Sequence, residues 1–199
     1  MKKSLFLKIT LILLLVFNSL KSQKNNLEYQ NDNLIQNLGI GLVQFTNTAE
    51  KIKLYSDNTF TQTKNIKIGS SFIPILNKPD YGILFFVCVE KKTNYYKLAI
   101  SKNDFAYIKP SQNFLYYTWE SFLKDQVSGI KSKNIKSNSP RATINGKLLN
   151  TATWKNDDEI EIIKIQDNWI QIRNISQNRL FWIQWRDEKE LKVYLNLLI

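Results

Sequence analysis

Hydrophobic and polar residues alternate with a period of two along much of this 199-residue chain, most clearly in its last forty residues. The alternating runs cover residues 159–165, 169–173 and 181–185. A period of two is the mark of a half-buried β-strand, so each run is predicted to be a strand. The phase slips by one residue between Ile162 and Ile163, which predicts a β-bulge there.

Short runs of the same kind fill residues 50–110, and five short strands at this spacing are typical of a small barrel. They are predicted at residues 51–55, 65–75, 83–89, 95–100 and 105–108. The run from Ile83 to Val89 is apolar throughout, which indicates a strand covered on both faces. The aromatic residues 114–123 that follow are predicted to form a strand and then a helical turn.

The polar stretches between these runs divide the chain. Residues 23–47 form a predicted N-terminal leader, rich in Gln, Asn and Lys at its start and with a short helix or irregular segment at residues 34–45. Residues 126–139 carry Ser, Asn and Lys and are predicted to be a linker. The expected domains are therefore residues 48–125 and residues 140–199, in an all-β protein with minor helix.

The first 22 residues have the composition of a secretory signal. Lys2 and Lys3 precede an apolar run at residues 9–17, and small polar residues follow up to Ser22. The run is about half of the roughly 20 residues that a membrane-spanning helix needs. We therefore expect a removed signal peptide and an exported protein, located in the periplasm or outside the cell.

The chain is basic, with 28 Lys and Arg against 17 Asp and Glu and a formal charge of +11. Four lysines belong to the predicted signal, so 24 basic residues against 17 acidic ones leave +7. This excess favours anionic partners such as cell-wall polymers or peripheral contact with lipid head groups. Nucleic acid is not expected as a partner of an exported protein, and solubility alone is the simpler role of the charge.

The chain has no histidine and one cysteine, Cys88. The absence of histidine excludes Ser-His-Asp and Cys-His catalysis and every His-ligated zinc site. Cys88 lies in the apolar run 83–89 and is interpreted as a buried small hydrophobe. The acidic cluster at residues 157–161 is interpreted as a solvated strand face, so neither a metal nor a cofactor is expected.

Residues 140–199 resemble the bacterial SH3-like domains that occur as repeats in exported proteins. The similarity is carried by Arg141 to Asn145-Gly146, by the strand, turn and tryptophan of residues 160–172, and by Trp182-Ile183. Phe181 stands where the family usually has glycine. Residues 48–125 resemble the same fold more loosely, so the resemblance implies two small SH3-like barrels in tandem.

Sixty-residue barrels are marginally stable alone, because they bury only about 60% of their unfolded surface. We therefore expect residues 114–122 to pack between the two units. Five isoleucines are the expected core of the second unit, and they are Ile160, Ile162, Ile170, Ile172 and Ile183.

The resemblance implies a non-catalytic binding protein for a cell-wall peptide or an envelope protein partner. SH3-type barrels bind extended peptides or sugars in aromatic-lined grooves. Trp185 directly precedes the turn at Arg186, which favours a position at the barrel rim. The candidate ligand-binding residues are Tyr55, Tyr81, Tyr117, Trp119 and Trp185, and the alternative for several aromatics is a place in the core or the domain interface.

Two other classes of function remain open at this point. An accessory subunit or a carboxylate-dependent hydrolase of the envelope would need two acids in one cleft, for example from Asp80, Asp104 and Glu120. A structural envelope subunit would instead present a large flat apolar patch without a groove.

Overall fold

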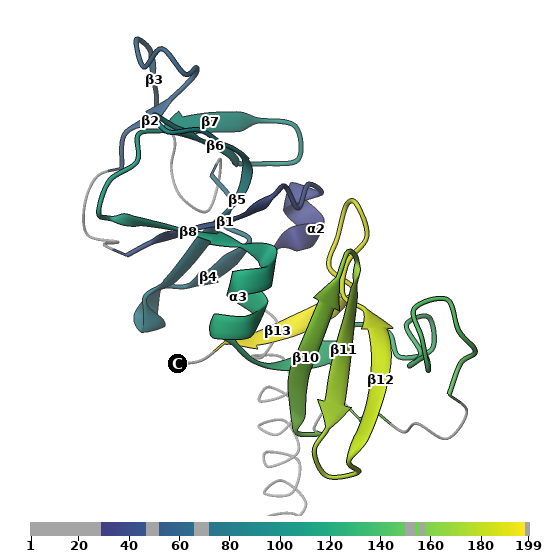
Figure 1. Cartoon of the computed structure of the whole chain (residues 1–199). Coiled ribbons are helices and arrows are strands. Elements are labelled where there is room, and N and C mark those ends of the chain that lie inside the picture. Colours follow the sequence, from purple (N-terminus) through teal and green to yellow (C-terminus); the bar gives the residue numbers. More distant parts are fainter. Residues whose placement is uncertain (1–28, 47–51, 66–71, 150–153, 156–157, 198–199) are drawn as a thin grey trace, which may run out of the picture.

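The computed structural model describes residues 29–46, 52–65, 72–149, 154–155 and 158–197 (Figure 1). The predicted signal peptide and most of the polar start of the leader lie outside these residues. The predicted all-β class with minor helix is confirmed. Within the described ranges the strands form several sheets, and none of these sheets closes into a barrel, unlike the tandem barrels that the resemblance implied.

The larger sheet is antiparallel, and its strands follow the order β3-β2-β7-β6-β5-β1-β8, with β4 also paired to β5. The elements are β1 Gly41–Phe45, β2 Leu54–Tyr55, β3 Thr63–Lys64, β4 Leu76–Lys78, the 3₁₀ turn η1 Pro79–Tyr81, β5 Ile83–Lys91, β6 Tyr96–Ala99, β7 Phe105–Ile108 and β8 Phe114–Thr118. As predicted, β5 is buried on both faces over most of its length. A register shift between Cys88 and Glu90 marks a β-bulge in β5.

The leader prediction was wrong for residues 41–45. This segment is β1, which lies between β5 and β8, with Gly41 opposite both Cys88 and Thr118. Glycine is required there, because a Cβ on Gly41 would lie 2.2 Å from the Tyr117 carbonyl oxygen. Gly41 is thus a sign of close strand packing. A short helix is present as α2 Asp32–Ile35, but it overlaps the expected range of residues 34–45 only at Leu34 and Ile35.

Two smaller antiparallel sheets form the second half of the molecule. β10 Ile160–Gln166, β11 Trp169–Asn174 and β12 Arg179–Gln184 make one, and β9 Val127–Ser132 and β13 Val193–Leu197 make the other. The bulge predicted in β10 is confirmed by a register shift between Ile162 and Lys164. Four of the five expected core isoleucines are buried, and Ile162 is half-buried.

The linker prediction was wrong for residues 127–132, which form β9. This strand pairs with the C-terminal β13, with Ser132 opposite Val193 and Ile130 opposite Leu195. Its composition is polar because only Val127, Ile130 and Ser132 are buried, while the residues between them are more exposed. The C-terminal strand therefore depends on residues that precede the expected domain boundary.

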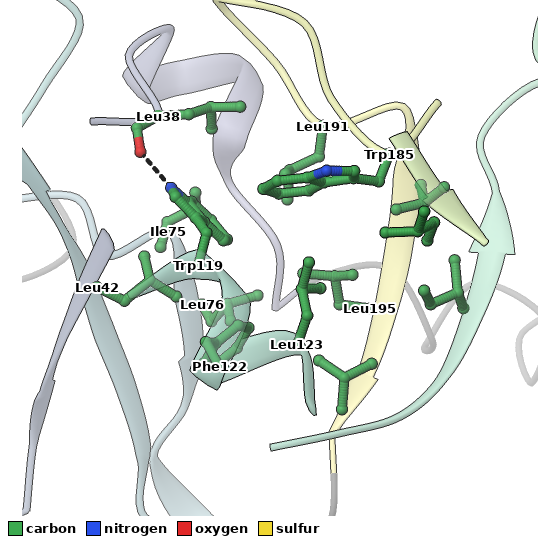
Figure 2. Packing of buried hydrophobic residues seen from close by; sticks show 14 of the residues in the cluster. Leu38, Leu42, Ile75, Leu76, Trp119, Phe122, Leu123, Trp185, Leu191 and Leu195 are labelled. Carbon is green, nitrogen blue, oxygen red and sulfur yellow. Dashed lines mark hydrogen bonds between the residues drawn. The ribbon is translucent and has the colours of Figure 1, made fainter. Parts of the chain in front are cut away.

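The two halves share one apolar core, in which Trp119 of helix α3 (Trp119–Asp125) packs against Trp185 (Figure 2). Their ring centroids are 5.2 Å apart at an interplanar angle of 56°. The Trp119 indole donates to the Leu38 carbonyl at 2.6 Å, and the Trp185 indole donates to the Asp167 carbonyl at 3.0 Å. The prediction that residues 114–122 pack between the units is confirmed for Trp119 and Phe122.

A buried carboxylate ties the N-terminal segment to the C-terminal strand. Asp32 is 1% exposed and accepts hydrogen bonds from the backbone N–H of Leu191 and the ammonium of Lys133, each at 2.8 Å. Gln30 donates to Asp32 at 3.0 Å and accepts from the Leu195 N–H at 3.1 Å. The bonds that Asp32 accepts from Lys133 and Leu191 therefore hold together segments that are far apart in the sequence.

We expect Asp32→Ala to lower the free energy of unfolding by roughly 3–5 kcal/mol, the usual effect of removing one partner from a buried ion pair. The Lys133 ammonium and the Leu191 N–H would lose their acceptor. Urea unfolding followed by tryptophan fluorescence measures the loss. Glu188→Ala, at an exposed acid, is the control and should change stability by less than about 0.5 kcal/mol. Equal stability of the two variants would contradict this role of Asp32.

We also expect residues 140–199 to fail to fold cooperatively when produced alone. The fragment lacks β9, the partner of β13, and Trp119, which covers Trp185. A fragment of residues 120–199 contains β9 but still lacks Trp119, so it should remain less stable than the whole protein. Thermal unfolding by circular dichroism measures both, and a cooperative transition of fragment 140–199 at the temperature of the whole protein would refute the shared core.

Candidate binding site

The two tryptophans predicted to bind a ligand lie in the core. Trp119 is 5% exposed and Trp185 is 1% exposed, and each indole N–H donates to a backbone carbonyl. The prediction was wrong for both residues in this structure, because neither offers a ring face to a ligand. Trp185 is not at a rim, since Trp119 and Leu191 cover it (Figure 2).

Tyr117 and Tyr81 lie in two different surroundings. The Tyr117 ring is 6.0 Å from that of Phe85, its hydroxyl donates to Gln44 at 3.3 Å, and burial raises its pKa. Tyr81 is 54% exposed in the turn η1, and the Lys78 ammonium lies 3.9 Å from its ring centre. Tyr117 is thus mainly a packing residue, whereas Tyr81 is open to solvent.

Tyr55 belongs to a contiguous group of rings and lysines over β2, β6 and β7, here named the aromatic–lysine strip. Its members are half-buried or exposed except Tyr95, which is buried. Figure 1 shows these three strands at the end of the molecule that lies away from the β10–β12 sheet. The members of the strip are Tyr55, Phe60, Tyr95, Lys97, Phe105, Tyr107 and Lys109.

Strand alternation brings these side chains to one face. Tyr95 and Lys97 are two residues apart, as are Phe105 and Tyr107, and Tyr55 lies directly opposite Tyr107. The rings of Tyr55 and Phe60 meet edge to face at 5.1 Å. Those of Tyr95 and Tyr107 meet in the same way at 5.5 Å, so rings line the strip along its length.

Two ammonium groups lie over these rings. Lys97 is 4.6 Å from the Phe105 ring centre and 5.7 Å from that of Tyr107. Lys109 is 4.8 Å from Phe60 and 5.9 Å from Tyr55. Cation–π contact holds each ammonium at the ring surface without neutralising its charge. Within the described residues, neither lysine makes an ion pair.

The acids beside the strip are bound to other groups. Asp104 forms an ion pair with Lys64 at 2.5 Å. Glu90 accepts a hydrogen bond from the Tyr95 hydroxyl at 2.9 Å, and this bond, with burial, raises the pKa of Tyr95. Glu90 stands opposite Lys97 in the sheet register, but in the described residues neither acid forms an ion pair with Lys97 or Lys109.

The loop that presents Phe60 is held by Asp57, whose carboxylate accepts from the Thr59 hydroxyl at 2.5 Å and from the Thr59 N–H at 2.8 Å. These bonds lower the pKa of Asp57. Phe60 itself has a φ of 60°, a left-handed conformation that is uncommon for a bulky residue. Such strain often accompanies a functional surface, because the chain must hold a side chain in a required place.

The remaining acids do not form a paired-carboxylate centre with the strip. Glu120 pairs with Lys124 at 2.7 Å, Asp80 is exposed in η1, and Asp158 accepts from Asn174 at 2.7 Å. In the part of the chain that the structure describes, no group of three or more Cys, Asp or Glu side chains could hold a metal ion. Rings and ammonium groups can bind a flat or apolar ligand that carries carboxylates.

Sequence reasoning missed Phe60, Lys97, Phe105 and Lys109. The spacing of residues 95, 97, 105 and 107 could have placed Lys97 and Phe105 on the face of the tyrosines. No pattern in the sequence indicated Phe60 or Lys109, which lie outside the strands.

Cys88 is fully buried in the sheet, as predicted, and burial raises its pKa to about 12. With an ordinary cysteine pKa near 8.5, its thiolate fraction at neutral pH is lower by roughly a thousandfold. Because only the thiolate reacts, we expect native protein to react with a thiol reagent at least about a hundredfold more slowly than protein unfolded in guanidinium. Fast reaction of native protein would show that the sheet opens at β5.

Comparison with known proteins leaves this chain without a family assignment. No family model, no curated protein and no solved structure matches it. The geometry of the aromatic–lysine strip is therefore the basis on which a function can be argued.

Proposed function

We propose that this chain is an exported, non-catalytic binding protein that holds a cell-wall peptide or an extended segment of an envelope protein on the aromatic–lysine strip. The observation that carries the proposal is the pair of lysines, Lys97 and Lys109, held over ring faces without a carboxylate partner in the described residues. The likeness of residues 140–199 to SH3-like domains is part of the same proposal.

The chemistry of such a ligand matches the strip. A cell-wall peptide carries several carboxylates separated by small apolar groups, so it offers negative charge and apolar surface in alternation. The two ammonium groups attract the carboxylates, and the tyrosine and phenylalanine rings cover the apolar groups between them. An extended peptide suits this site, because the rings and lysines follow one another across neighbouring strands.

Export supports an envelope ligand over an intracellular one. The proposal relies for export on the Lys2-Lys3 start and the apolar run at residues 9–17. In the described ranges, no helix is long and apolar enough to cross a membrane. The basic charge of the chain adds long-range attraction to an anionic wall.

The test is sedimentation of the purified protein with cell-wall sacculi at low and at high salt. We expect Lys97→Ala with Lys109→Ala to weaken binding about tenfold, since two partly exposed cation contacts together contribute about 1–2 kcal/mol. Tyr107→Ala should weaken binding at both salt concentrations, because apolar contact is not screened by ions.

The matched control is Lys155→Ala with Lys189→Ala, which removes the same charge from exposed positions in the second half of the chain. It should bind sacculi nearly as the unaltered protein does. If both double variants lose binding equally, net charge rather than the strip holds the protein to the wall. Absence of binding by the unaltered protein would reject the cell-wall ligand and leave the envelope protein partner, to be tested by crosslinking through position 107.

A further inference from the structure

We propose that the opposite face of the same sheet carries a second, separate site, a pocket for a small ligand in which an anionic group is joined to a flat ring. The pocket has a volume of about 540 Å³ and is lined by Lys91, Lys92, Thr93, Tyr96 and Pro110. This volume is within the range of about 300–1,000 Å³ that small-molecule sites occupy.

Strand alternation separates this pocket from the aromatic–lysine strip. Tyr96 packs against the apolar cluster that contains Leu98 and Ile108, whereas its neighbour Lys97 points to the strip. The two sites therefore use the two faces of β6.

The bulge in β5 brings Lys91 to the pocket. Before the bulge Val87 is opposite Ala99 and Cys88 is opposite Leu98, but after it Lys91 is opposite Tyr96. An unbroken register would place Lys91 opposite Tyr95, on the face of the strip. Residues directly opposite each other share a face, so the single extra residue moves the lysine from one site to the other.

Tyr96 supplies the ring of the pocket lining against which a flat ligand can stack, and the ring of Tyr116 packs against that of Tyr96. Their centroids are 6.0 Å apart and their planes differ by 18°. The Lys91 ammonium lies 4.8 Å from the centre of the Tyr116 ring. Both phenols are neutral at neutral pH and do not repel an anion, and burial raises their pKa further.

The pocket keeps a net positive charge. Lys91 makes no ion pair within the described residues, and Lys92 has one carboxylate near it, Glu90 at 3.7 Å. Glu90 also accepts a hydrogen bond from Tyr95. Two ammonium groups, the Thr93 hydroxyl and a ring wall suit a phosphate or a carboxylate attached to an aromatic or similarly flat body.

The test compares the binding of four probes to the purified protein by isothermal titration calorimetry: phenyl phosphate, benzoate, inorganic phosphate and benzyl alcohol. We expect phenyl phosphate or benzoate to bind at least about tenfold more tightly than both inorganic phosphate and benzyl alcohol, because only they engage lysines and rings together. The tighter of the two identifies the anion as phosphate or carboxylate.

Two variants locate the binding. Lys91→Ala with Lys92→Ala should reduce the affinity for phenyl phosphate or benzoate to that for benzyl alcohol. Tyr96→Leu should reduce the affinity for the same two probes to that for inorganic phosphate. Lys97→Ala with Lys109→Ala is the control on the other face and should leave the affinity for phenyl phosphate and benzoate unchanged. The proposal for the pocket and the proposal for the aromatic–lysine strip are therefore tested separately.

The pocket is rejected if the ring-bearing anions bind no better than inorganic phosphate or benzyl alcohol. It is also rejected if the Lys91–Lys92 double variant, which alters exposed side chains only, binds them as well as the unaltered protein does. Thermal unfolding of each variant separates loss of binding from loss of fold.

Discussion

The burial of Trp119 against Trp185 is the contact on which the rest of the structure depends. Each indole removes a large apolar surface from water and satisfies its N–H with a carbonyl from a third segment, at Leu38 or at Asp167. An indole that lost its carbonyl would leave a buried donor unpaired. This contact, with the Asp32 network beside it, makes the two halves one cooperative unit instead of two barrels.

The shared core determines where ligands can bind. It occupies the end of the large sheet that carries α2 and α3, so the rings at that end are packing residues. The end formed by β2, β6 and β7 lies away from the second half (Figure 1). Tyr55, Phe60, Phe105 and Tyr107 are only half-buried there, and Lys109 is exposed. Because successive residues of β6 point to opposite faces, this end can hold two sites that do not interfere. The bulge between Cys88 and Glu90 places Lys91 on the face of Tyr96 instead of the face of the strip.

Local patterns in the sequence predicted most of the strands and their irregularities. The apolar run 83–89 became the doubly covered strand β5, and the phase slip at Ile162 became a bulge in β10. Errors arose where burial is intermittent or the backbone is unusual. β9 shows only Val127, Ile130 and Ser132 to the interior, so its composition is that of a linker. β1 contains a glycine because its neighbour leaves no room for a Cβ, and glycine in a sequence does not distinguish close packing from a loop.

The sequence by itself determined the all-β class, the basic charge, the absence of histidine chemistry and the alternating faces of the regular strands that it predicted. These properties depend on composition and on a repeat of two residues, both of which are local. Only the tertiary structure decided that Trp119 and Trp185 are core residues, that β13 pairs with β9, and that Lys97 and Lys109 lie over rings. The reason is physical. Whether an aromatic ring is buried or exposed depends on segments tens of residues away, and a periodic pattern does not indicate which distant segment will pack against the ring.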